Sequence, residues 1–427
     1  MDSLSPKQLE SAKAAAQAIS GAAKTLPLLR AMEWDDAMRV KFLRSGALPA
    51  PDYLAVDTSA AAETLSSARK SVEGDHPVFQ WLSRVCGDLT TTISLLQSRG
   101  TAEFHTHSKA LFGAPTKLMI DRKTRVLDLA KHMDSSLETL DFDKLVMEGD
   151  RIEYTAAEFA QKLRPRLKTH FGAAAPVVKV VAGLSAKASA GARRIRVRKG
   201  ARFTPRDVEQ LLQHEALIHA ATALNGRLQD GFPVLGRAHA GTTEVQEGLA
   251  VFAEIMSGAM DPRRFRRLSD RVLAIDLATK GADFKEVFEF YLPRADTPDQ
   301  AYENTRRIFR GGLVSGGAPF TKDLVYLNGL LRVHNYMRSV VKLGRADLIR
   351  IMFSGKMDIE DIPALAYLAG EGALAGPKYM PPWVKDLRFL VSYLAYSSFL
   401  NQVKMPGFQS YYEKALADVP VVWDAVQ

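Results

Sequence analysis

Apolar residues recur three and four positions apart along most of the chain, which is the spacing of helices that bury one face. Residues 7–23, 78–96 and 154–167 show this pattern. The period changes at residues 176–182, which are rich in β-branched side chains, and at 194–198, where arginine alternates with isoleucine and valine. The pattern predicts a mainly α protein with a small antiparallel β-sheet of two or three strands.

The stretch from residue 211 to residue 223 differs from these helices because apolar residues lie on all of its sides. Thr204 is a suitable N-cap, Pro205 fits the first helical position, and Asp207 has the spacing of a capping box. We therefore expect a helix over residues 205–224 that is buried on most sides.

Glu215 is the only formally charged side chain between Gln210 and Asn225. An unpaired carboxylate in such surroundings would be costly. His214 precedes it and His219 follows. A metal cation beside imidazole groups would remove that cost, and a His-Glu pair with a second histidine on one helix is typical of zinc hydrolases.

The spacing of the two histidines is unusual, because His214 and His219 are five positions apart rather than four. On a regular α-helix this step leaves them roughly 140° apart, so they could not share one ion. A π-bulge would bring them to the same side, and such bulges occur mostly at functional sites. We therefore expect a local widening between Glu215 and His219. The alternative is a pair of hydrogen-bonded core histidines, with Glu215 ending in a water-filled crevice.

A second helix is predicted over residues 244–256, because Thr243 and Gln246 have capping-box spacing. Gly248 lies inside this helix, where glycine costs about 1 kcal/mol relative to alanine. Close approach of another backbone or of a metal would explain that glycine.

The first turn of this second helix supplies a third candidate ligand, Glu247. Two histidines on one helix and a glutamate on the next form a thermolysin-like ligand set, with a fourth position left to water. Glu244 and Glu254 compete with Glu247 for this role.

The motif HEALIH followed by QEGLA, with RIFRGG and KDLVYLNG further on, resembles the bacterial QEGLA-motif proteins once linked to flavohaemoglobin expression. It is also similar to the zinc tyrosine carboxypeptidases that trim the C-terminal tyrosine of α-tubulin. The resemblance is strongest from about residue 191 to residue 331. It implies one zinc ion on His214, His219 and Glu247, with Glu215 as general base, in a thermolysin-like (gluzincin) metallopeptidase core wrapped by helices.

We therefore expect a zinc metallocarboxypeptidase that, by resemblance, releases tyrosine or another aromatic residue. Such an enzyme must recognise a free carboxylate, which guanidinium groups bind bidentately. Four side chains in the matching stretches are predicted to bind substrate: Arg307, Arg310, Lys322 and Tyr326. The alternative is structural salt bridging, with partners such as Asp323, Glu303 and Asp299.

Two other functional classes stay open. One is a metal-binding regulatory protein without peptidase activity, and the other is an endopeptidase or another amide hydrolase. Structural zinc is normally closed by four protein ligands rich in cysteine. Cys86 is the only cysteine in the chain, so a cysteine-rich zinc site cannot form here. The predicted ligand set instead leaves one position open, which argues against the first class.

The charge balance bears on the partner. The net charge is +9 over 427 residues, and a dense basic cluster contains Arg263, Arg264, Arg266, Arg267 and Arg271. This cluster is either a solvated helix face or a surface that attracts an acidic polypeptide tail. We recognise no nucleic-acid-binding module. We therefore expect the C-terminal tail of a polypeptide as partner and no nucleic acid.

We divide the chain into an N-terminal helical region (1–150), a metallopeptidase core (151–335) and a C-terminal helical region (336–427) that packs on the core. With no export signal and no apolar run long enough for a bilayer, we expect a cytoplasmic protein without a membrane span. His105 and His107 could bind a metal if their segment were a strand, and a solvated or hydrogen-bonded pair is the alternative.

Overall fold

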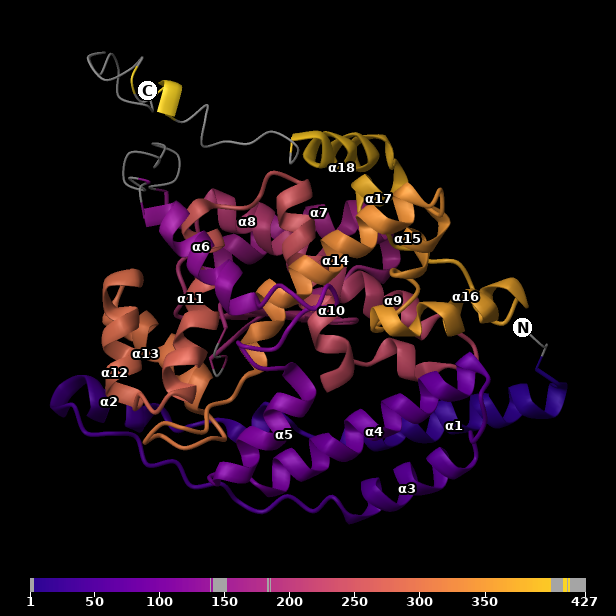
Figure 1. Ribbon diagram of the computed structural model, residues 1–427, viewed down its shortest axis with the longest axis horizontal. Helices are drawn as coiled ribbons and strands as arrows, with labels where there is room; N and C mark the ends of the chain where they lie inside the picture. Colours follow the sequence, from indigo (N-terminus) through magenta and orange to yellow (C-terminus); the bar gives the residue numbers. More distant parts are fainter. Residues whose placement is uncertain are drawn as a thin grey trace.

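A computed structural model describes residues 4–138, 140, 152–182, 184, 186–400, 410–412 and 414. Helices dominate and one small sheet is present, so the predicted α+β class with mainly helical content is confirmed (Figure 1). The predicted boundary between residues 150 and 151 lies outside the described residues.

The N-terminal part of the chain is helical, as its apolar spacing predicts. Its elements are α1 (Pro6–Thr25), η1 (Arg30–Met32), α2 (Asp36–Ser45), α3 (Ser59–Lys70), α4 (Pro77–Gln97), α5 (Ala102–Phe112) and α6 (Val126–Glu138). Helix α1 buries a stripe of mostly small residues, Ala12, Ala15, Ala16, Ser20 and Ala22 with the larger Ile19, and packs with this face against α3 and α4 (Figure 1).

The sheet has three strands, β1 (Val177–Val181), β2 (Ala188–Gly191) and β3 (Arg194–Arg198), in the order β1-β3-β2. The prediction of an antiparallel sheet is wrong in part: β2 and β3 pair antiparallel, whereas β1 and β3 pair parallel. The physical reason is strand order. Consecutive strands alternate in direction, so the first and third run the same way, and β3 lies between the other two.

The central part of the chain surrounds a long helical segment made of α8 (Pro205–Leu211), η5 (Leu212–Ala220) and α9 (Ala221–Arg227). Helix α10 (Ala240–Met256) packs on η5 and is crossed by α14 (Val325–Lys342) near the middle of the molecule (Figure 1). The remaining elements here are α7 (Ala156–Phe171), η4 (Gly172–Ala174), η6 (Pro233–Gly236), α11 (Pro262–Thr279), α12 (Phe284–Tyr291), η7 (Leu292–Arg294), α13 (Pro298–Phe309) and η8 (Lys322–Leu324).

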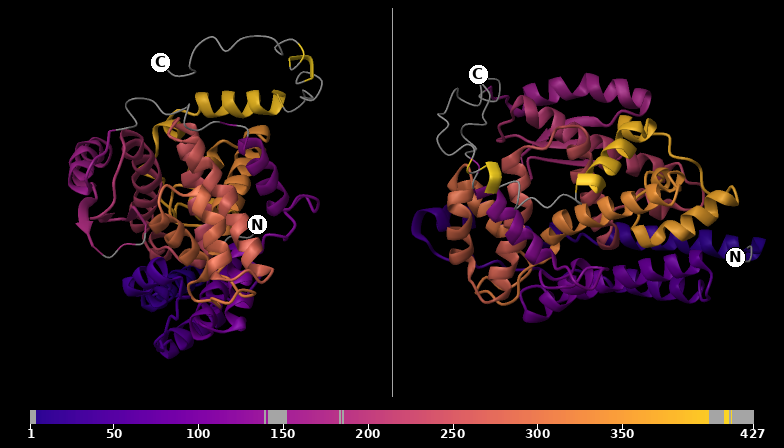
Figure 2. Two further views of the ribbon diagram at one scale, coloured as in Figure 1. Left: turned by 90° about the vertical axis from the view of Figure 1, so that its left-hand side faces the viewer. Right: turned by 45° about the horizontal axis from the view of Figure 1, so that its top comes forward.

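The C-terminal part adds α15 (Asp347–Ile351), η9 (Ile359–Asp361), α16 (Ile362–Gly370), α17 (Pro382–Lys385) and α18 (Arg388–Leu400). Helix α18 lies across one end of the molecule, and the sheet with α7 forms one flank (Figure 2). Within the described parts of the chain, no helix combines the length and apolar character needed to cross a membrane.

Buried apolar side chains form two clusters, a large one through the N-terminal helices, α10, α11 and α14, and a smaller one that joins α7, the sheet and the α8–α9 segment. The η5 segment lies between them: Ile218 belongs to the large cluster, whereas Leu212, Ala216 and Leu217 belong to the smaller one. This position explains why apolar residues occur on every side of the 211–223 stretch.

Candidate metal centre

The segment with the two histidines has the predicted widening. Thr204 and Asp207 form the predicted capping box at the start of α8, and the helix then changes to a π-helix over Leu212–Ala220. In a π-helix the hydrogen bonds run over five residues rather than four. His214 and His219 therefore face the same side, with ring centroids 4.8 Å apart.

Helix α10 starts earlier than predicted, at Ala240 with His239 as its N-cap. The predicted cap, Thr243, instead donates its hydroxyl hydrogen to the His239 carbonyl 3.1 Å away, so it lies within the helix. As a correction, Glu247 is the eighth residue of α10 and lies at the start of its third turn rather than in its first turn.

The predicted close approach at Gly248 is present. A Cβ atom on Gly248 would lie 2.1 Å from the carbonyl carbon of Gly329, and a Cβ on Gly329 would meet the Glu244 carbonyl oxygen equally closely. The two glycines let the backbones of α10 and α14 cross in contact. This crossing fixes the position of α10, and therefore of Glu247, relative to the π-helix.

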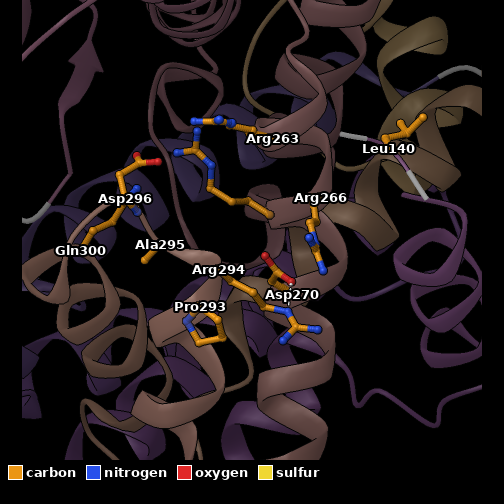
Figure 3. A pocket seen from close by; sticks show the side chains of 10 residues that line it. Leu140, Arg263, Arg266, Asp270, Pro293, Arg294, Ala295, Asp296 and Gln300 are labelled. Carbon is orange, nitrogen blue, oxygen red and sulfur yellow. Dashed lines mark hydrogen bonds and ion pairs between the residues drawn. The ribbon is translucent and has the colours of Figure 1, made fainter. Parts of the chain in front are cut away.

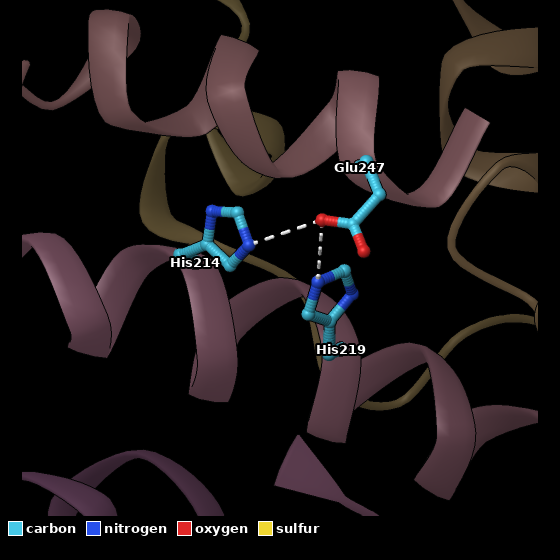
Figure 4. A group of neighbouring side chains, drawn as sticks. All are labelled: His214, His219 and Glu247. Carbon is cyan, nitrogen blue, oxygen red and sulfur yellow. Dashed lines mark ion pairs between the residues drawn. The ribbon is translucent and has the colours of Figure 1, made fainter. Parts of the chain in front are cut away.

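The three predicted ligands converge. Glu247 Oε2 lies 3.4 Å from His214 Nε2 and 3.6 Å from His219 Nε2 (Figure 4). Two atoms bound to one tetrahedral zinc ion at its usual bond lengths are roughly 3.3 Å apart. Within the described residues, these three side chains are the group whose donor atoms lie close enough to hold a metal ion. Their arrangement fits a single ion.

The other two candidate carboxylates have different partners. Glu254 is fully buried and accepts a hydrogen bond from His214 Nδ1 at 2.6 Å and another from Gln210 at 3.0 Å. Arg264 binds both Glu254 oxygens. Burial raises the pKa of Glu254, but Arg264 and His214 outweigh it and bring the pKa to about 2.

The hydrogen bond from His214 Nδ1 to Glu254 orients the imidazole ring so that its Nε2 atom points to Glu247. This is the usual arrangement behind a metal-binding histidine. The remaining candidate, Glu244, forms an ion pair with Arg332 at 2.7 Å.

Glu215, the predicted general base, is buried in the π-helix next to His214. Among the described residues, none forms a hydrogen bond with its Oε2 atom, and the same holds for Glu247 Oε2. Buried carboxylate oxygens are normally satisfied. These two are therefore available to a ligand and to a reacting proton.

The four predicted substrate-binding side chains come together, and two of them, Lys322 and Tyr326, are close enough to Glu247 to interact with its charge. Arg307 donates to both Asp323 oxygens, at 2.6 and 2.9 Å, and to the Tyr326 hydroxyl at 3.4 Å. The Lys322 Nζ atom lies 5.8 Å from the centre of the Tyr326 ring. Structural salt bridging to Asp323 is thus present for Arg307.

Lys322 and Arg310 differ from Arg307, which is paired with Asp323. Both are buried, and no side chain in the described residues forms an ion pair with either. Burial lowers the pKa of Arg310 to about 10, with neighbouring Arg307 acting in the same direction. Burial also lowers the pKa of Lys322 against the attraction of Glu247. Two buried cations without an ion-pair partner, one of them close to Glu247, favour an anionic ligand.

The basic cluster on α11 is not a simple solvated face. Arg264 is committed to Glu254, and the Arg271 guanidinium lies 3.9 Å from the centre of the Tyr326 ring. Its other members line a cavity of about 380 Å³, shown in Figure 3 with Arg263, Arg266, Asp270 and Arg294 labelled. Arg294 pairs there with Asp270 at 3.1 Å, so part of the positive charge in this cavity is neutralised.

His105 and His107 lie on helix α5, so the strand required for a metal site at this pair is absent. The His105 Nδ1 atom is 2.8 Å from the Pro319 carbonyl oxygen, and the His107 Nε2 atom is 3.3 Å from Glu103. The hydrogen-bonded alternative is correct.

One further charged residue, Lys356, was not predicted from the sequence. Its side chain is buried, and its Nζ donates to the Gln246 Oε1 atom at 2.8 Å. Gln246 directly precedes Glu247. A lone lysine within the small and apolar stretch 352–357 was the available signal, although it does not identify the partner.

Comparison with known proteins gives one family. A family model described as microtubule-associated tyrosine carboxypeptidase matches residues 41–402 of the 427-residue chain. No curated protein matches the chain. The match covers both candidate ligand helices and the whole cationic group around Glu247.

Proposed function

The chain belongs to the microtubule-associated tyrosine carboxypeptidase family, and on this basis we propose that it is a zinc-dependent carboxypeptidase that releases a single C-terminal residue, tyrosine or another aromatic, from a polypeptide. The observation that carries this proposal is the convergence of His214, His219 and Glu247 beside two unpaired buried cations. We assign the metallopeptidase core to residues 151–335, with a thermolysin-like arrangement of its two ligand helices.

In this proposal His214, His219 and Glu247 hold one zinc ion. When bound, zinc polarises the scissile carbonyl group and lowers the pKa of water to about 7. The spacing of the three donor atoms supports this assignment, as do the absence of cysteine ligands and the carboxylate behind His214.

Glu215 is the general base. Its Oε2 atom has no hydrogen-bond partner in the described residues, so it can accept the proton of the attacking water. The same oxygen then passes the proton to the leaving amine. Burial keeps bulk water away from this transfer, which strengthens the electrostatic contribution of each nearby charge.

Lys322 and Arg310 bind the C-terminal carboxylate of the substrate. Their burial without a counter-ion supports this role, because a carboxylate would remove the cost of two unpaired charges. Arg307 holds Asp323 and Tyr326 in place and so supports the pocket from behind. Tyr326 and Arg271 form an adjoining wall with aromatic character.

Amidated peptides test the proposal. The purified protein should contain one zinc ion and should release the terminal residue from peptides with a free C-terminal carboxylate. Amidation of the C-terminus should raise KM at least tenfold, because a neutral amide leaves Lys322 and Arg310 unpaired. Equal cleavage of both peptides would indicate an endopeptidase, and zinc without any hydrolysis would indicate a metal-binding regulatory protein.

A further inference from the structure

The loop that contains Lys356 is hydrogen-bonded to α9, which continues the helical segment of the two histidines, and to the residues that follow α9. Asn225 of α9 donates to the Phe353 carbonyl at 2.7 Å, and Gln229 donates to the Ser354 carbonyl at 3.1 Å. The Lys356 backbone N–H donates to the Leu235 carbonyl, also at 2.7 Å. Helix α9 and the residues that follow it therefore hold the loop of this lysine in place.

The side chain of Lys356 is held at its tip by one partner. Gln246 Oε1 accepts from Lys356 Nζ at 2.8 Å and from the Thr222 hydroxyl at 2.9 Å. An ammonium group has three N–H donors. In the part of the chain that the structure describes, Gln246 is the hydrogen-bond partner of the Lys356 ammonium, so the other N–H groups have no acceptor there.

The charges that face Lys356 are the two carboxylates of the proposed reaction. Burial lowers the pKa of Lys356 to about 8, while Glu247 and Glu215 oppose this shift. Among the described residues, neither carboxylate has an oxygen within 4 Å of Lys356 Nζ, the limit for an ion pair. A buried cation thus stands near the base and the third ligand without being neutralised by either.

We propose that Lys356 is a further catalytic residue, whose ammonium group donates a hydrogen bond to the scissile carbonyl oxygen as water adds to the carbonyl carbon and negative charge builds on that oxygen. This inference rests on the proposed function. A fixed cation in a buried site stabilises such charge without reorganisation during the reaction. The Gln246 Nε2 atom, buried and without a hydrogen-bond partner among the described residues, lies on the same side chain that orients Lys356.

The test is Lys356→Met, which keeps an unbranched side chain of similar length as far as Cε and removes the charged amino group. Loss of one donor to a developing oxyanion lowers kcat by about 100- to 1000-fold. KM for a free-acid peptide should change less than about threefold, since the contact forms fully only in the transition state. Zinc content should stay at one ion per chain. The matched control is Lys342→Met, which removes an exposed lysine at the end of α14 and should keep wild-type kcat.

Ligand affinity gives a second measurement that does not depend on turnover. A phosphinic peptide that mimics the tetrahedral transition state should bind Lys356→Met about 100-fold more weakly than it binds the wild type. The uncleaved substrate, measured in a Glu215→Gln background, should bind equally well with and without Lys356→Met. A lysine that only compensates buried charge would weaken both ligands alike, or would reduce zinc content, and either result would overturn the inference.

A second variant keeps the inference testable if Lys356→Met does not fold. Gln246→Met retains the ammonium group and removes the acceptor that orients it, so kcat should fall about tenfold with zinc retained. Unchanged kcat in this variant, or in a folded Lys356→Met, would reject the role of Lys356 while leaving the proposed peptidase intact. A wild-type protein that hydrolyses no peptide would reject the proposed function and this inference together.

Discussion

The carboxylates around the two histidines differ in their partners, and the partners separate their roles. Glu247 faces both imidazole Nε2 atoms, Glu254 accepts a hydrogen bond from the opposite nitrogen of His214 and pairs with Arg264, and Glu244 is paired with Arg332 of α14. Sequence spacing alone left all three as possible third ligands. It could not rank them, because the distinction depends on partners from α11 and α14 that are distant in sequence.

Replacing Glu247 with Gln should lower zinc affinity by at least tenfold, because an amide oxygen is a weaker ligand than a carboxylate for this cation. The measurement is zinc occupancy after dialysis against a weak chelator. Glu244→Gln is the matched control, since Glu244 pairs with Arg332, and it should keep full occupancy. Full zinc in Glu247→Gln would show that another residue completes the ligand set.

Replacing Glu254 with Gln should reduce zinc affinity or kcat by about 10- to 100-fold, the usual effect of losing the carboxylate behind a ligand histidine. The variant also leaves the partly buried Arg264 without its counter-ion. A second change, Arg264→Met, removes that unpaired charge and should recover part of the stability but not the zinc affinity. Recovery of both by the double variant would mean that Glu254 serves only to neutralise Arg264.

Among the secondary-structure elements, the predictable features were those encoded by adjacent residues. Thr204, Pro205 and Asp207 mark the start of α8 as expected, and the five-residue spacing of the histidines predicts the π-helix. The predicted start of α10 was wrong because two capping signals overlap there. The His239 backbone N–H donates to the Thr242 hydroxyl at 3.3 Å, and this interaction sets the helix start ahead of Thr243.

The crossing of α10 and α14 gives a prediction for Gly248. In Gly248→Ala the new methyl group would overlap the Gly329 backbone, which cannot move as a side-chain tip can. The free energy of unfolding should fall by roughly 1–3 kcal/mol or more, as in other overpacked cores. Gly21→Ala is the control: Gly21 lies exposed within α1 with open space around its Cα, so alanine should stabilise by about 0.5–1 kcal/mol. Equal stability of Gly248→Ala and wild type would contradict the observed crossing.

For the whole molecule, the features that sequence patterns could not provide are long-range ones. The order β1-β3-β2 makes the sheet mixed, yet each strand alone has the same pattern in either arrangement. Lys356 reaches Gln246 across 110 residues of sequence. Such contacts depend on how the two apolar clusters enclose the η5 segment, and no local period encodes that enclosure.

Acid stability should depend on His239, the N-cap of α10. Burial, with nearby Arg84, lowers its pKa to about 4 in the folded protein. An unfolded histidine has a pKa of about 6.5, so between these two values the unfolded chain binds a proton that the folded protein does not. Stability is therefore lost as the pH falls from about 6.5 towards 4. Between pH 7 and pH 5 the loss from this residue is at most about 2 kcal/mol.

His239→Asn keeps a side chain suited to an N-cap and does not titrate, so its melting temperature should fall less than that of wild type between pH 7 and pH 5. His132→Asn, which replaces an exposed histidine of α6, should follow the wild type. The same pH dependence in all three proteins would show that His239 takes up a proton in the folded state.

The most direct test of the central claim is the release of single C-terminal residues from free-acid and amidated peptides by the zinc-loaded wild type and by Glu215→Gln. We predict release of a terminal aromatic residue from the free acid, at least tenfold weaker use of the amide, and loss of nearly all turnover in Glu215→Gln with one zinc ion retained. Wild-type turnover in Glu215→Gln, or equal cleavage of acid and amide, would contradict the account.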